Sequence, residues 1–147
     1  MDPEYTDRFL ATTGSAVTDT STDPQTVLHA SFDAIIRGDF DAFGESVTDD
    51  VELSVSGFGP LDGSWRGRDA VVAATRRNFA MLDSQKPEID GVICQGDRIA
   101  VLLRESGVFK TSGEVYSVRG VQWFTFADGK IKKIDEIVAS VLKTDSP

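Results

Sequence analysis

The chain has 147 residues, of which 40% are apolar and 27% charged, as is typical of one globular domain. Its formal net charge is −9 and its basic residues are scattered, which argues against nucleic-acid binding because an acidic surface repels phosphate. No apolar run is long enough to span a membrane, and the start of the chain lacks the basic and apolar blocks of a secretory signal.

Cysteine and histidine are too few to form an internal disulfide or a metal site rich in these residues. Cys94 is the only cysteine, so no internal disulfide can form, and this favours a cytoplasmic location. His29 is the only histidine, and no Cys and His cluster exists, so we expect no metal.

Residues 1–23 are rich in Thr, Ser and Asp and show no sustained period, which predicts a flexible arm. The folded domain is expected over residues 24–143, with a short tail at 144–147. Asp23 followed by Pro24 is typical of a helix start, and Gly38 of its end. Asp39 can then cap a short second helix that carries Phe40, Phe43 and Val47.

Residues 49–56 alternate apolar and polar side chains, which predicts a half-buried strand. Glycine and proline in 57–65 indicate a loop. A third helix is predicted after Gly67 and through Leu82, and Pro87 blocks its continuation.

The remaining chain is predicted to be strands at 88–95, 98–109, 115–126 and 130–142, the last two joined by a turn at Asp128-Gly129. This order predicts an α+β domain in which three N-terminal helices pack on a strongly bent antiparallel or mixed sheet. Such a cone-shaped α+β barrel has an open mouth, which is a natural small-molecule pocket.

Three segments carry a resemblance to a known family: "AIIRGDFDAFGESVTDDVEL", "GSWRGRDAVVAATRRNF" and "GDRIAVLLRESGVFKTSGEVYSVRGVQWFTFADGKI". In this order they resemble the SnoaL-like branch of the nuclear-transport-factor-2-like superfamily, over roughly residues 24–140. The resemblance implies a cofactor-free pocket and a dimer formed through the sheet. Relatives include a ketosteroid isomerase, polyketide cyclases, a dehydratase, an epoxide hydrolase and binding domains, so the fold alone does not select a reaction.

Two of these chemistries can be tested against the residues. Ungapped counting from Gly38-Asp39 puts the three functional positions of the ketosteroid isomerase at Ser31, Val55 and near Gln122, so its Tyr and both Asp are missing. The epoxide hydrolase uses an Asp-Arg-Asp set. Suitable residue types are present here, but not at the spacing of its motif: Arg104, Arg119 and Asp135.

The resemblance to SnoaL-like cyclases implies an acidic residue that takes a proton from carbon, a role open to Glu136 or Asp135. The hairpin register decides which of them faces the pocket. A three-residue loop with Gly129 in the bulge position sets Gln122 opposite Glu136 and turns both toward an apolar face, whereas a two-residue loop shifts the pairing by one. We prefer the first register.

The sequence therefore predicts an apolar small-molecule pocket, with Glu136 and Gln122 as candidate catalytic residues. Candidate substrate-binding residues share the pocket face, the helices or the loop at the mouth: Ser31, Trp65, Tyr116, Leu28, Ile35, Phe79, Phe124, Ile134 and Val138. The leading function is a cofactor-free isomerase, cyclase or lyase acting on a small carbonyl or polyketide-like compound. The alternative is a non-catalytic ligand-binding or adaptor module. An outward Trp123 beside Val121 predicts a homodimer through the sheet.

Overall fold

The computed structural model describes residues 23–141, which form three α-helices and a six-stranded mixed sheet. The helices are α2 (Pro24–Ile36), α3 (Phe40–Glu45) and α4 (Arg68–Ala80), and η1 (Gly59–Leu61) is a short 3-10 turn. The strands are β1 (Val47–Ser56), β2 (Gly63–Arg66), β3 (Leu82–Gln95), β4 (Arg98–Phe109), β5 (Val115–Ala127) and β6 (Lys130–Ser140). The predicted α+β class is confirmed. The predicted tail at 144–147, and all of the predicted arm except Asp23, lie outside the described residues.

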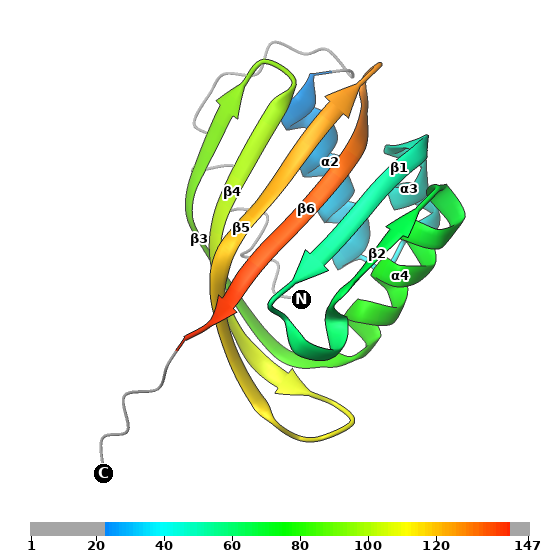
Figure 1. The fold of residues 1–147 in the computed structure, drawn as a ribbon. Coiled ribbons are helices and arrows are strands. Elements are labelled where there is room, and N and C mark those ends of the chain that lie inside the picture. The colour runs from blue at the N-terminus through cyan, green and yellow to red at the C-terminus, as the bar shows by residue number, and fades with distance from the viewer. Residues whose placement is uncertain (1–22, 142–147) are drawn as a thin grey trace.

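The sheet has the order β2-β1-β6-β5-β4-β3, in which only β1 and β6 run parallel. It curves, and α2 and α4 lie against its concave side (Figure 1). Gly120 in β5 permits part of this shape, because a Cβ atom there would lie 2.0 Å from the backbone oxygen of Ile137 in β6. Only a glycine therefore fits at this close approach of two strands.

The helix starts follow the sequence signals closely. The Asp23 side chain accepts a hydrogen bond from the Thr26 backbone at 3.4 Å, and Asp39 accepts one from the Ala42 backbone at 3.0 Å. Each carboxylate satisfies an amide that has no partner within the helix. Gly38 has a φ of 75°, the left-handed conformation that ends a helix.

Three predicted boundaries are wrong. Val47 begins β1 instead of continuing the second helix, and the predicted loop at 57–65 contains both η1 and most of β2. The third helix ends at Ala80, and Pro87 lies within β3. A proline is tolerated there because β3 is an edge strand, where an amide can be missing without breaking an inner ladder.

The β5–β6 hairpin has the predicted pairing, but its turn differs from the predicted three-residue loop. Gln122 pairs with Glu136 and Phe124 with Ile134, as predicted. Asp128 and Gly129 both have positive φ and form a two-residue turn, since Ala127 pairs directly with Lys130. The register shifts between Phe126 and Thr125, and this bulge restores the alternation that puts Glu136 on the inner face.

Candidate functional site

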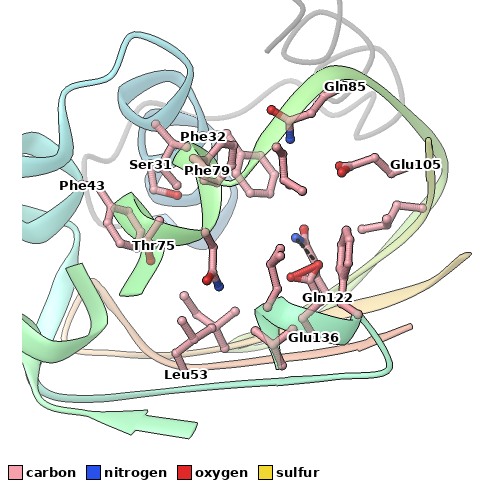
Figure 2. A pocket seen from close by; sticks show the side chains of 18 of the residues that line it. Ser31, Phe32, Phe43, Leu53, Thr75, Phe79, Gln85, Glu105, Gln122 and Glu136 are labelled. Carbon is pink, nitrogen blue, oxygen red and sulfur yellow. Dashed lines mark hydrogen bonds between the residues drawn. The ribbon is translucent and has the colours of Figure 1, made fainter. Parts of the chain in front are cut away.

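A cavity lies between the concave face of the sheet and the helices, and Figure 2 shows side chains from both layers around it. Its volume is about 100 Å³. At 10–15 Å³ per water, this is space for on the order of seven to ten water molecules, or for a ligand of similar size. The lining is mostly apolar, with seven polar or acidic residues among its members: Ser31, Thr75, Asn78, Gln85, Glu105, Gln122 and Glu136.

Glu136 and Gln122 meet on the sheet floor of this cavity (Figure 2). They are opposite each other in the β5–β6 ladder, and the Gln122 Nε2 donates a hydrogen bond to the Glu136 Oε2 at 3.5 Å. The Gln122 Oε1 is buried and has no hydrogen-bond partner among the described residues. Since buried polar atoms are usually paired, this oxygen is an acceptor available to a ligand.

Glu105 brings a second carboxylate into the cavity from β4 (Figure 2). The Tyr116 hydroxyl donates a hydrogen bond of 2.6 Å to its Oε2. Gly107 makes this contact possible, because a Cβ there would lie 2.6 Å from the Tyr116 hydroxyl oxygen. Gln85 also hydrogen-bonds the Glu105 side chain. Neutral donors therefore hold this carboxylate from two sides.

The surroundings favour the protonated form of Glu136. Burial raises the pKa of Glu136 to about 7, and the negative charges of Glu105 and Asp62 act in the same direction, whereas the Gln122 hydrogen bond opposes them. Burial also raises the pKa of Glu105, against the hydrogen bonds from Tyr116 and Gln85. The pKa of the Tyr116 phenol is raised by burial and by Glu105, so this group is a hydrogen-bond donor.

The structure brings together seven of the eleven site residues suggested by the sequence. Besides Glu136 and Gln122, the cavity lining includes Ser31, Ile35, Phe79, Phe124 and Ile134. Ser31 is almost fully buried, and its hydroxyl donates to the Leu28 backbone oxygen at 2.8 Å. The same hydroxyl oxygen can still accept a hydrogen bond.

Four suggested residues lie outside the lining. Leu28 is fully buried in the core, and Val138 is also buried there, opposite Gly120 near the end of β6. Tyr116 is outside the lining, but its hydroxyl donates to Glu105, which is part of it. Trp65 is on the edge strand β2, where the Arg77 guanidinium lies 5.3 Å from its ring centre. Its ring covers the core beside α4 rather than the cavity.

The lining also contains polar residues that sequence reasoning missed, above all Glu105, Asn78 and Gln85. The alternation of β4 could have indicated Glu105, because alternate residues of a strand face the same side and Val101 and Leu103 face inward. Asn78 is one of the buried α4 residues, and its Oδ1 accepts hydrogen bonds from Arg77 at 3.1 and 3.3 Å. Its amide nitrogen remains as a donor.

The three positions aligned with the ketosteroid isomerase do line the cavity, as Ser31, Val55 and Gln122. Val55 pairs with Glu136 across the parallel β1–β6 ladder. A carboxylate is therefore present on the strand next to the position where the isomerase has its base.

The residue types of the epoxide hydrolase are on the other side of the sheet. Arg104 forms ion pairs with Asp90 and Glu88, both at 2.9 Å. Asp135 accepts a hydrogen bond from Ser54 at 2.7 Å and faces Lys133 at 3.8 Å. Neither lines the cavity, and Arg119 does not either.

The outer face of the sheet exposes a row of apolar side chains. Leu102, Val121 and Ile137 are direct neighbours across β4, β5 and β6, and Leu102 and Ile137 are 39% and 55% exposed. Trp123 is in the next row and is 38% exposed. Within residues 23–141, no helix is long and apolar enough to cross a membrane, and no three potential metal ligands cluster.

Residues 28–134 match the family model described as SnoaL-like domain. A comparison with curated proteins finds no match.

Solved structures share the fold. An NTF2-like protein from Burkholderia xenovorans LB400 is 22% identical with a TM-score of 0.69, over 83% of this chain and 92% of that one. A protein of ketosteroid isomerase-like fold from Catenulispora acidiphila, in complex with trimethylamine, is 15% identical with a TM-score of 0.61, over 82% and 87%. An LEH-like epoxide hydrolase from M. tuberculosis is 17% identical with a TM-score of 0.60, over 76% and 79%.

Proposed function

This chain belongs to the SnoaL-like domain family, and we propose that it is a cofactor-independent enzyme that moves a proton on a small carbonyl or polyketide-like compound. The single observation that carries this proposal is Glu136, a carboxylate inside an apolar cavity with its pKa raised to about 7. A general acid or base works best when its pKa is close to the working pH. In this proposal the curved sheet and the helices form a cone whose interior holds the substrate.

The ionised Glu136 takes a proton from the carbon next to the substrate carbonyl, and the electrons of that C–H bond form an enolate. Gln122 holds the Glu136 carboxylate through its Nε2, which keeps the base oriented between turnovers. The Asn78 amide nitrogen is a donor for the enolate oxygen, because Arg77 already binds the Asn78 Oδ1. Return of the proton to another carbon gives an isomerase. Attack of the enolate on a second carbonyl, with the proton passing from Glu136 to the new alkoxide oxygen, gives a cyclase.

The cavity volume favours small substrates over a steroid-sized one. The trimethylamine complex of the Catenulispora acidiphila protein supports the idea that a protein of this fold binds a small organic molecule. We extend that idea to this chain as part of the proposal.

Deuterium exchange tests the proposal directly. A panel of small ketones is incubated with the protein in D2O, and loss of the signal of the C–H next to the carbonyl is followed by proton NMR. We expect exchange above the buffer rate with the unmodified chain and a loss of about 100-fold or more in Glu136→Gln, since general-base catalysis contributes about 10²–10⁴-fold.

Asp135→Asn is the matched control, because it removes a carboxylate from the next residue, which faces the other side of the sheet. Equal exchange by the unmodified chain and Glu136→Gln would remove the catalytic role. The ligand-binding or adaptor alternative would then lead.

A further inference from the structure

The described lining of the cavity holds two carboxylates and no basic side chain. None of the described lining residues is a lysine, arginine or histidine. The hydrogen-bond donors to Glu105 and Glu136 are the Tyr116 phenol and the amides of Gln85 and Gln122, all of them neutral. A buried carboxylate in an apolar setting is costly without a counter-charge. The ionised cavity therefore needs a cation, and its described lining supplies none.

The polar atoms left open in the cavity are mainly acceptors. The Gln122 Oε1 is buried without a described partner, and it lies beside the carboxylate of Glu136. Glu105 has two donors but carries up to four acceptor positions on its two oxygens. A ligand that satisfies these atoms must bring N–H or O–H donors.

The apolar part of the lining is aromatic in large measure. Five phenylalanines line the cavity: Phe32, Phe43, Phe58, Phe79 and Phe124. Phe58 also contacts the Tyr116 ring, with ring centres 5.2 Å apart, next to the carboxylate that Tyr116 binds. Aromatic faces attract a desolvated cation through the ring quadrupole, so they suit the same ligand as the two carboxylates.

We propose that the ligand of this cavity carries a protonated amine on a small apolar body, and that Glu105 is the residue that selects this charge. This inference rests on the proposed function for the identity of the site, and it adds the substrate class. The two carboxylates have different roles in it. Glu105 is held by Tyr116 and Gln85 and pairs with the ammonium, whereas Glu136, with one weak donor at 3.5 Å, exchanges the proton.

Three ligands of nearly equal shape test the charge selection in the full chain. Isopentylamine is a cation at neutral pH, isopentanol is neutral and isovalerate is an anion. Isothermal titration calorimetry should give affinities in that order, with isopentylamine about 10- to 100-fold tighter than isopentanol, as expected for one charge-assisted hydrogen bond. Isovalerate should show no measurable binding.

Glu105→Gln should weaken isopentylamine binding far more than isopentanol binding, and so abolish the preference for the amine. Glu45→Gln is the matched control, because it removes the same charge from an exposed position on α3 outside the cavity, and it should keep the preference. Equal binding of the amine and the alcohol by the unmodified chain, binding of none of the three, or a preference that survives in Glu105→Gln would each overturn the proposal.

A measurement on the unmodified chain covers the case in which Glu105→Gln does not fold. Isopentylamine stays protonated from about pH 5 to about pH 8, so a fall in its affinity at the lower pH reports protonation of the cavity. The groups that shift the pKa of Glu136 are Glu105, Gln122 and Asp62, Glu136 in turn raises the pKa of Tyr116, and those that shift the pKa of Glu105 include Tyr116 and Gln85. The affinity for isopentylamine should fall at least several-fold more than that for isopentanol; an unchanged amine affinity counts against the proposal.

The two proposals fail separately. Loss of charge selection with deuterium exchange intact removes only the amine as ligand class. Absence of exchange with charge selection intact removes only the proposed reaction.

Discussion

Replacing Glu136 by glutamine should stabilise the protein, and the gain should grow with pH. The glutamine keeps the size of the side chain and its ability to hydrogen-bond Gln122, but it carries no charge to bury. The pKa of Glu136 is raised from an ordinary 4.5 to about 7, so the folded state holds the proton to a higher pH than the unfolded state does. Below about pH 4.5 Glu136 is protonated in both states, and burying it costs no charge. As pH rises toward and through 7 its ionisation destabilises the folded state, and Glu136→Gln avoids this loss of stability.

The magnitude follows from the two pKa values. A difference of about 2.5 corresponds to roughly 3 kcal/mol, at 1.36 kcal/mol for each pKa unit. Water can enter the cavity and solvate part of the charge, so we expect a gain of about 1–3 kcal/mol above pH 8 and close to zero near pH 4.5.

Urea unfolding followed by tryptophan fluorescence measures this gain at several pH values, for the unmodified chain and for Glu136→Gln. Asp135→Asn controls for the loss of one negative charge from an acidic protein. The reasoning is refuted if Glu136→Gln is less stable than the unmodified chain at about pH 8, or if its advantage is the same at about pH 5.

The structure makes three further predictions. Tyr116→Phe should lower the free energy of unfolding by about 1–3 kcal/mol at neutral pH, measured by urea unfolding, because Glu105 loses its 2.6 Å donor. An unchanged free energy of unfolding would show that water replaces the hydroxyl. Gly120→Ala should lower the free energy of unfolding by about 3 kcal/mol or more in the same assay, since its Cβ would lie 2.0 Å from the Ile137 oxygen. A small decrease would mean that β5 and β6 separate easily. We also propose that the exposed row containing Leu102 and Ile137 is a homodimer interface. In sedimentation, the unmodified chain should then be a dimer and Ile137→Lys a monomer. A monomeric unmodified chain would contradict the proposal.

Local signals in the sequence predicted the helix starts and the inner strands well. The capping carboxylates of Asp23 and Asp39 act within four residues of where they stand, so no distant contact is needed to interpret them. The boundaries that failed depend on neighbours far away in the sequence. Residues 63–66 are a strand because they pair with the edge of β1. Pro87 is tolerated because β3 is the edge strand of the sheet that the described residues form.

The hairpin register shows how a right pairing can follow from a wrong turn. The expected three-residue loop and the observed two-residue turn with a bulge both add one residue to the β6 side, so both leave Gln122 opposite Glu136. The apolar pattern of the two strands selects this pairing, because the alternative turns Ile134 and Val138 toward solvent. Burial of the correct face, rather than the turn, therefore decides where Glu136 points.

The second carboxylate of the cavity could not be interpreted from its own strand alone. The alternation of β4 indicates that Glu105 faces inward, but an inward glutamate can equally be a residue at a solvated strand end. Its role becomes clear only with Tyr116, which donates to it from β5, and with Gly107, two residues further along β4, which leaves space for the Tyr116 ring. A buried carboxylate with neutral donors keeps its charge available for a ligand, whereas an arginine partner would have cancelled it. In our proposal, the neutral donors therefore distinguish a cavity that binds a cation from one in which the acid is only structural.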